Sequence, residues 1–478
     1  MAAAVAAVGG LVLRLAMLSS GWGVMDADEA VVGLMARAIL RGDLPTFYWG
    51  PQNYGGTAES FLVAPVFALT GTTALGLRFV TAALHAAAAV FTWRIGKRVV
   101  GPYVGAAAGL LVWLWPTANV FLSIRTRGFY GTTMAAGLAF VLATLRLAER
   151  PNRRDALLGG LAAGIGWWSA PQVLVFVIPA VLWVFLCARQ ALKPLLGFGL
   201  PASVVGAAPW LLFQLRYGLV SLTPSPLPPG VAGSYADHLE TFATKGFPMA
   251  LGLRMPWSEL WVPGGRVLYA VALVALLVGL AWRRAPVLLW LGLLVFPLFH
   301  AVSTMSGYVG EGRYLVYYVP FVALALAAVV RHRLALPVLV VAAALLTVHT
   351  VETVDRAPPM AAPDRPIPDR LGPLVEDLEA RGLTAAYAEY WLAYRLMFES
   401  DERIVVGIVP PFVSRRPELD RRVDTAERAA YVAVADSLHV HLLRRELPRL
   451  GVTWQEHDVG GFTVIVPDRR VTAGQLTY

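Results

Sequence analysis

Charged residues are scarce in this sequence. Only 15% of its 478 residues are Asp, Glu, Lys or Arg, whereas 57% are hydrophobic. A water-soluble chain of this length would fill two or three domains and would need far more charge on its surface. The low charge therefore argues against a soluble enzyme and predicts a polytopic membrane protein.

The sequence also has only one cysteine, no cluster of histidines and no visible repeat. The single cysteine, Cys187, can form no disulfide within the chain, and the histidines show no H-x-x-H-type spacing that would predict a metal site. No internal repeat is visible, which weakens the inverted-repeat architecture of many transporters. The first apolar run has no basic leader and no convincing cleavage site, so we expect a retained first span rather than a signal peptide.

The hydrophobic residues are gathered into runs long enough to cross a hydrocarbon core, which takes roughly 20 residues of helix. We expect an α-helical membrane region over residues 1–351. Eleven candidate spans lie at about 4–20, 75–93, 99–115, 129–147, 156–169, 171–188, 194–213, 267–282, 285–302, 314–330 and 334–351.

Topology explains the net charge of +9 better than nucleic-acid binding does. Five short loops on one side of the predicted spans hold thirteen basic residues, and the short loops on the other side hold only Arg125, Arg127 and Arg313. The positive-inside rule then places the N-terminus in the cytoplasm and the C-terminus outside, in the plasma (inner) membrane. No nucleic-acid partner is expected.

Three predicted outer segments are too long to be simple connections: loops at about 21–74 and 214–266, and the tail 352–478. The tail is polar enough to form a soluble α/β domain on the extracytoplasmic side. We expect its arginines at 415, 416, 421 and 422 to lie on solvated faces. Predicted helices lie near 369–381, 390–399 and 438–449, and predicted strands near 384–388, 403–408, 430–435, 452–456 and 461–466.

The first outer loop opens with three carboxylates at the start of a predicted helix that Gly42 ends. Asp26 and Glu29 have the spacing of a capping box, so a structural role for these two is as plausible as a chemical one. Asp28 is not needed for capping, and the helix N-terminus favours its ionised form. It is therefore a candidate general base, the alternative being a surface carboxylate that complements the helix dipole.

These residues resemble a known family. The stretch Asp26-Ala-Asp28-Glu29, followed by Gly42-Asp-Leu-Pro45, is similar to the first outer loop of GT-C glycosyltransferases, which include protein O-mannosyltransferases and the lipid A aminoarabinose transferase. Three further motifs resemble the same group, and Val32 stands where many relatives carry a tyrosine. These motifs are Gln52-Asn-Tyr54-Gly-Gly-Thr-Ala-Glu59, Arg313-Tyr314, and Glu389-Tyr-Trp-Leu-Ala-Tyr-Arg-Leu-Met-Phe398.

The resemblance implies an inverting transferase that moves a sugar from a polyprenyl-phosphate donor to an acceptor lipid, protein or polysaccharide. Asp28 would be the catalytic base, Glu29 would orient the sugar or the helix, and Asp26 is the competing candidate. Arg125, Arg127 and Arg313 would bind the donor phosphate, the alternative being anchors at the lipid headgroups. The sequence predicts no metal site, but a divalent metal ion remains an alternative because some members of the family use one. The remaining substrate-binding candidates are Gln52, Tyr54, Glu59, Tyr130 and Tyr314.

Two rival functions remain open. A flippase or transporter of lipid-linked sugars would need polar residues along a path through the bilayer, yet the predicted mid-span positions are almost all apolar. A transferase of whole oligosaccharides, or a glycan polymerase, would use the same chemistry, but the modest outer tail favours a single-sugar donor.

Overall fold

The computed structural model describes residues 2–50, 54–223, 233–354 and 365–477. By its internal contacts the chain forms two compact units. The helical unit comprises Met1–Ser19, Tyr54–Leu62 and Arg78–Asp355. The α/β unit comprises Ser20–Asn53, Val63–Leu77 and Arg356–Tyr478. The first of these α/β segments, which carries Asp28, therefore groups with the C-terminal tail.

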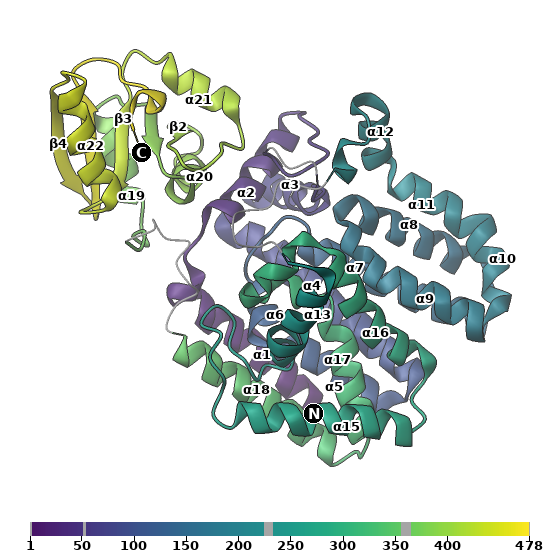
Figure 1. Cartoon of the computed structure of the whole chain (residues 1–478). Helices are drawn as coiled ribbons and strands as arrows, with labels where there is room; N and C mark the ends of the chain where they lie inside the picture. Colours follow the sequence, from purple (N-terminus) through teal and green to yellow (C-terminus); the bar gives the residue numbers. More distant parts are fainter. Residues whose placement is uncertain (1, 51–53, 224–232, 355–364, 478) are drawn as a thin grey trace. The chain divides into compact units, whose positions relative to one another are not determined.

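The helical unit is built mainly from apolar helices (Figure 1). Helices α3 (Ala58–Thr70) and α4 (Ala74–Val99) belong partly to each unit. The others are α1 (Ala2–Leu18), α5 (Pro102–Leu114), α6 (Thr117–Leu122), α7 (Tyr130–Glu149), α8 (Arg153–Ser169), α9 (Leu174–Cys187), α10 (Leu192–Pro194), α11 (Leu200–Gly206), α12 (Ala208–Tyr217), α13 (Tyr235–Thr241), α14 (Phe247–Ala250), α15 (Gly265–Trp282), α16 (Val287–Val302), α17 (Val319–Val330) and α18 (Ala335–Thr353).

Among the described residues, four helices are long and apolar enough to cross a membrane, and up to six spans result if each of two bent helix pairs counts as one. Four shorter apolar helices accompany them. Each of the eleven predicted runs contains helix, so the helical fold is confirmed, whereas the number of spans stays a prediction. The apolar helix α3 lies inside the predicted outer loop 21–74 and was not expected from the sequence.

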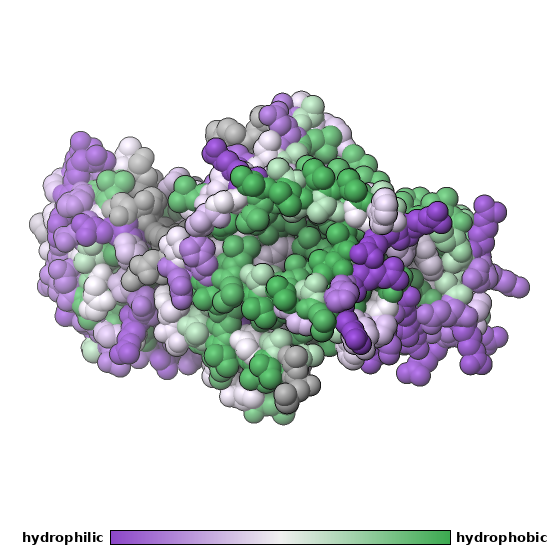
Figure 2. Space-filling view, turned by 90° about the horizontal axis from the view of Figure 1, so that it is seen from below, coloured by the Kyte–Doolittle hydropathy of each residue, from purple (hydrophilic) through white to green (hydrophobic). Residues whose placement is uncertain are grey.

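Hydrophobic side chains also cover much of the outside of this unit. Figure 2 shows them gathered in a broad area in the middle of the view. Val8 on α1, Val271 on α15 and Val341 on α18 are each more than half exposed. An apolar area of this extent is costly in water and is satisfied by lipid, which agrees with a membrane protein.

The α/β unit contains a five-stranded mixed sheet in the order β2-β1-β3-β5-β4. β1 pairs in parallel with β2 and β3, while β5 pairs antiparallel with β3 and β4. All the predicted strands and helices of the tail are present, and α21 was not predicted. The strands are β1 (Ala385–Ala388), β2 (Val405–Ile408), β3 (Ala430–Val434), β4 (Trp454–Val459) and β5 (Phe462–Pro467), and the helices are α19 (Gly372–Ala380), α20 (Tyr390–Glu399), α21 (Pro417–Asp424) and α22 (Leu438–Arg449).

Two features of the sequence set the shape of this sheet. Gly460 and Gly461 form a two-residue turn between β4 and β5 with φ angles of 60° and 87°, which is the left-handed backbone that a tight hairpin demands. Tyr387 on β1 and Tyr431 on β3 are directly paired, and their rings stack with centroids 4.9 Å apart. The sheet therefore has a defined register at its centre.

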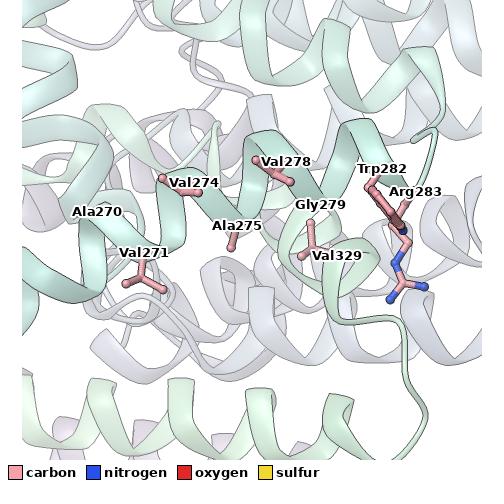
Figure 3. A pocket seen from close by; sticks show the side chains of 9 residues that line it. All are labelled: Ala270, Val271, Val274, Ala275, Val278, Gly279, Trp282, Arg283 and Val329. Carbon is pink, nitrogen blue, oxygen red and sulfur yellow. The ribbon is translucent and has the colours of Figure 1, made fainter.

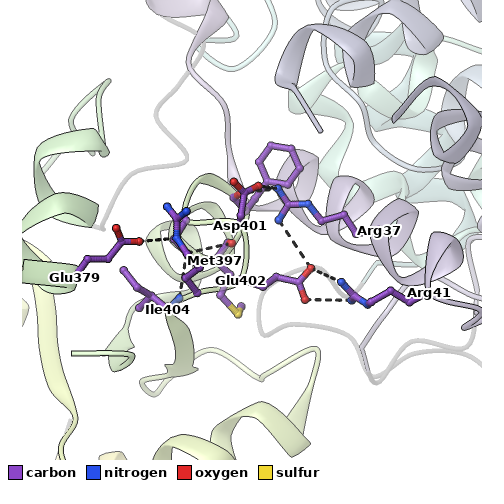
Figure 4. Close-up of polar contacts among 10 residues, drawn as sticks. Arg37, Arg41, Glu379, Met397, Asp401, Glu402 and Ile404 are labelled. Carbon is purple, nitrogen blue, oxygen red and sulfur yellow. Dashed lines mark hydrogen bonds and ion pairs between the residues drawn. The ribbon is translucent and has the colours of Figure 1, made fainter. Parts of the chain in front are cut away.

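Helix α2 (Ala27–Leu40), which carries Asp28, packs closely on α20 within the α/β unit. A Cβ atom at Gly33 would lie 2.3 Å from the ring of Phe398, so only glycine allows this approach. Figure 4 shows Arg37 and Arg41 of α2 reaching Asp401 and Glu402, which follow α20. The fold of the α/β unit thereby fixes the helix that bears the candidate base.

Candidate active site

The first turn of α2 shows how its three carboxylates differ. Asp26 is the N-cap, because its Oδ1 accepts the backbone N–H of Glu29 at 3.0 Å. Glu29 is fully buried, whereas the Asp28 side chain is 15% exposed. Asp26 thus has a structural role in starting the helix, whereas Asp28 is not its N-cap.

The Asp28 carboxylate lies in a polar cluster with other residues of the α/β unit. Its Oδ1 accepts a hydrogen bond from the Tyr390 hydroxyl at 2.5 Å and from Nη2 of Arg415 at 3.0 Å. The Tyr48 hydroxyl donates to the backbone carbonyl of Asp28 at 2.7 Å. Charge-assisted hydrogen bonds of this kind hold a carboxylate ionised and restrict its rotation.

Arg415 is the residue that the sequence analysis placed wrongly. It was expected on a solvated face, but its side chain is only 14% exposed and pairs with Asp28. Its guanidinium also donates to the Tyr390 hydroxyl at 2.5 Å and to the Trp49 carbonyl at 3.0 Å, and lies 4.6 Å from the centre of the Tyr48 ring. The physical reason is that acceptors from three other segments of the α/β unit surround it.

Burial and the nearby charge of Asp28 raise the pKa of the Tyr390 hydroxyl well above its usual value. The hydroxyl therefore stays protonated at any physiological pH and acts as a donor to the carboxylate. Burial alone would lower the pKa of Arg415, but Tyr48, Asp28 and Tyr390 raise it, so Arg415 stays a cation. The described cluster thus contains the Asp28 carboxylate, the Arg415 cation and the neutral hydroxyl donors of Tyr390 and Tyr48.

A second polar cluster lies in the helical unit. Glu59, on the first turn of α3, accepts a hydrogen bond from the Thr81 hydroxyl at 2.7 Å. Thr81 also shares a 2.7 Å hydrogen bond with Thr126, which stands between Arg125 and Arg127 in the loop before α7. Glu59, Arg125 and Arg127 are all buried. The structure thus connects the motif that closes the first loop with two of the predicted phosphate-binding arginines.

Aromatic residues of the helical unit join other predicted residues. The Tyr130 and Tyr314 rings lie 6.4 Å apart, and Tyr130 stacks on Tyr317 at 5.9 Å. Arg313 lies 5.0 Å from the centre of the Tyr314 ring. Tyr314, Tyr317 and His300 line a cavity of about 180 Å³. The late motif Arg313-Tyr314 is therefore next to a cavity, as a substrate-binding role requires.

Another apolar groove, of about 790 Å³, lies along α15 and Val329 of α17 (Figure 3). Arg283 and Trp282 lie at one end of it (Figure 3), and none of the predicted site residues lines it. We therefore do not assign it to the candidate active site.

The predicted site residues thus fall into two groups. The helical unit holds Glu59, Tyr130, Arg125, Arg127, Arg313, Tyr314 and the half-buried Tyr54, and the α/β unit holds Asp26, Asp28 and Glu29. Gln52 lies outside the described residues. Arg415 and Tyr390, which contact Asp28, were not among the predicted site residues, although Tyr390 lies inside a motif that the sequence had already singled out.

Among the residues that the structure describes, no group of three or more His, Cys, Asp or Glu side chains could hold a metal ion.

The whole chain shares its fold with solved glycosyltransferases. ArnT from Cupriavidus metallidurans in the apo state aligns with a TM-score of 0.64 at 14% identity, covering 99% of this chain and 100% of ArnT. ArnT from the same organism bound to undecaprenyl phosphate aligns with a TM-score of 0.51 at 15% identity, covering 96% and 97% of the two chains.

The oligosaccharyltransferase AglB from Archaeoglobus fulgidus, solved with an inhibitory peptide and a dolichol-phosphate, aligns with a TM-score of 0.50 at 12% identity, covering 90% of this chain and 69% of AglB. No family model and no curated protein matches the sequence. ArnT and AglB are both GT-C glycosyltransferases, so the expected GT-C fold is confirmed.

Proposed function

We propose that this chain is a membrane glycosyltransferase that moves a sugar from a polyprenyl-phosphate donor to an acceptor hydroxyl on the extracytoplasmic face. The observation that carries the proposal is the likeness of the fold to ArnT along the whole chain, including ArnT bound to undecaprenyl phosphate. Asp28, at the start of α2, supplies the carboxylate that such a reaction needs.

The reaction is a single displacement at the anomeric carbon of the sugar. Asp28 accepts the proton of the acceptor hydroxyl while that oxygen forms a bond to the anomeric carbon. The bond between this carbon and the phosphate oxygen breaks, and its electron pair leaves with the lipid phosphate. Because the attack comes from the face opposite to the leaving group, the configuration at the anomeric carbon inverts.

The leaving lipid phosphate needs charge stabilisation more than it needs a proton. Arg125, Arg127 and Arg313 are proposed for this task, since guanidinium matches phosphate with two parallel hydrogen bonds. Burial strengthens the case for Arg125 and Arg127, because an arginine that only anchors to headgroups has no need to be buried. Gln52, Tyr54, Glu59, Tyr130 and Tyr314 are proposed to bind the sugar and the acceptor.

The test is donor consumption by purified protein in lipid nanodiscs. A panel of radiolabelled polyprenyl-phosphate sugars is incubated with wild-type protein and with Asp28→Asn, which keeps the shape of the side chain and removes the base. We expect one donor to be hydrolysed or transferred by wild type and not by the variant. Flipping of a donor without consumption, unaffected by Asp28→Asn, would show a flippase instead.

A transferase of whole oligosaccharides is the second candidate, because the chain also shares the fold of AglB. Adding lipid-linked oligosaccharides to the same panel separates the two. Consumption of these donors alone would replace the single-sugar proposal.

A further inference from the structure

The guanidinium of Arg415 is held on several sides at once. It donates to Asp28, to Tyr390 and to the carbonyl of Trp49, and the backbone N–H of the same residue donates to the Tyr394 hydroxyl at 2.7 Å. An arginine whose planar fork has this many fixed partners is preorganised and loses little entropy when it binds a carboxylate. Arg415 is therefore built into the structure and does not sample many rotamers.

Arg415 and Tyr390 converge on one oxygen of Asp28. Both donate to Oδ1, at 3.0 Å and 2.5 Å, and Arg415 also donates to the Tyr390 hydroxyl. The three side chains thus form a closed triangle of hydrogen bonds. A carboxylate with one oxygen fixed by two charge-assisted bonds has a defined rotamer, and the direction of its other oxygen is then defined as well.

The far end of α2 is fixed to the same unit. Arg37 donates to the Phe398 carbonyl at 3.0 Å and pairs with Asp401 at 2.5 Å, and Arg41 pairs with Glu402 at 2.9 Å (Figure 4). Since both ends of α2 are tied to residues of the tail, neither the position of the helix nor the rotamer of Asp28 is set by α2 alone.

We propose that Arg415 and Tyr390 are positioning residues that hold the Asp28 carboxylate in the orientation needed for proton removal, so that the C-terminal tail is a working part of the transferase. The inference rests on the proposed function, in which Asp28 is the base. A general base acts only when its oxygen lies within hydrogen-bond reach of the proton. A misplacement of 1 Å can lower a rate by about 100-fold.

The described contacts of Asp28 include charged and neutral groups of this cluster and of its own helix turn. Arg415 is the cation, the hydroxyls of Tyr390 and Tyr48 are neutral donors, and Asp26 and Glu29 are the neighbouring carboxylates on α2. Removal of the Arg415 side chain takes a positive charge away from Asp28, while the carboxylates of Asp26 and Glu29 stay on the same helix turn. The carboxylate then holds its proton to a higher pH, which a purely structural contact would not cause.

Arg416 provides a matched control. It is the next residue in the same loop, carries the same charge, lies 4.2 Å from the centre of the Trp49 ring and pairs with Glu418. Its contacts thus also hold the loop, but they do not include Asp28. Arg416→Gln removes a charge and a loop contact and leaves the triangle intact.

The experiment measures donor turnover as a function of pH for full-length wild type, Arg415→Gln, Arg415→Lys, Tyr390→Phe and Arg416→Gln. For Arg415→Gln we expect kcat to fall by about 100-fold with the donor KM unchanged, and the acidic limb of the pH profile to move to higher pH. Arg415→Lys restores the position of the acidic limb and part of kcat. Tyr390→Phe, which removes one oxygen atom, lowers kcat by roughly 10-fold, and Arg416→Gln behaves as wild type.

Three outcomes overturn the inference. Equal profiles for Arg415→Gln and Arg416→Gln would show that the contact only holds the loop. An increase in donor KM at constant kcat would show that Arg415 binds the donor phosphate. Misfolding of Arg415→Gln together with a wild-type profile for Tyr390→Phe would leave only a structural role.

Failure of the proposed function has a different signature. In that case wild type consumes no donor, or Asp28→Asn turns over as fast as wild type, and the positioning role falls with it. Loss of turnover in Asp28→Asn combined with a normal profile for Arg415→Gln overturns the positioning role alone.

Discussion

Two polar clusters among the described residues differ in how far they expose a carboxylate. In the helical unit, Glu59 is buried and accepts a hydrogen bond from the hydroxyl of Thr81. In the α/β unit, Asp28 keeps some exposure and meets the full positive charge of Arg415. The two carboxylates thus differ in exposure, and a partly exposed carboxylate held by a cation is the stronger candidate for proton transfer.

The strongest test of this contrast is a pair of substitutions two residues apart. Asp28→Asn removes the base and should lower turnover by about 10³-fold in protein that is still folded at the assay temperature. Asp26→Asn keeps the N-cap, because asparagine caps as well as aspartate, and should retain turnover. Transfer assays and thermal unfolding in detergent measure both. The opposite ranking would make Asp26 the base.

A substitution next to Glu59 in the helical unit should lower the stability of the protein. Thr81→Val removes a buried hydroxyl that donates to Glu59 and contacts Thr126, and should lower the free energy of unfolding by roughly 1–3 kcal/mol. Thr92→Val is the control on the same helix, since the buried Thr92 hydroxyl donates to the Ala88 carbonyl one turn away. Thermal unfolding of the two variants is compared, and equal losses would show that no special interaction exists at Glu59.

The attachment of α2 should depend on Arg37 far more than on Arg41. Arg37 is buried and donates to the Phe398 carbonyl, so Arg37→Met should cost roughly 2 kcal/mol. Arg41 is half exposed, so Arg41→Met should cost at most about 0.5 kcal/mol. Protease sensitivity of residues 20–50 reports the detachment of the helix. Similar sensitivity of the two variants would contradict the ranking.

The smallest expected effect is on the loss of thermal stability at acidic pH, through Asp377. Burial would raise the pKa of Asp377, but hydrogen bonds from His457 and Arg381 lower it below the usual 3.8. Because the folded pKa is the lower one, this stabilisation is present above about pH 4 and is lost as the pH falls through the folded value. Asp377→Asn should therefore flatten the decline of thermal stability between about pH 5 and pH 3. The exposed neighbour Glu376 provides the control variant Glu376→Gln, and a decline as steep as that of wild type in Asp377→Asn would refute the expectation.

Local patterns were enough to predict most of the elements. The apolar runs and the alternating pattern of the tail predicted the helices and all five strands, because both signals repeat within a few residues. α21 was missed because it is short and highly charged, and α3 because Pro65 interrupts a short apolar run inside a predicted loop.

Only some residues of the candidate site could be predicted from the sequence, for a different reason. The spacing of Asp26, Asp28 and Glu29 identified the first turn of a helix, a feature of four neighbouring residues. Arg415 lies 387 positions away from Asp28, and an arginine in a polar segment has the same appearance in sequence whether it faces water or a carboxylate. The contact between Arg415 and Asp28 is visible only in the folded structure.

The route of the backbone has a consequence for how such a protein can be inherited. Between residues 19 and 78 the chain passes four times from one unit to the other, and a fifth time after residue 355. Recombination at a single junction therefore cannot exchange the whole α/β unit, because the tail is only one of its segments. A substitute tail would have to accommodate Gly33 beneath an aromatic ring and offer acids to Arg37 and Arg41, so the two ends of the gene must change together.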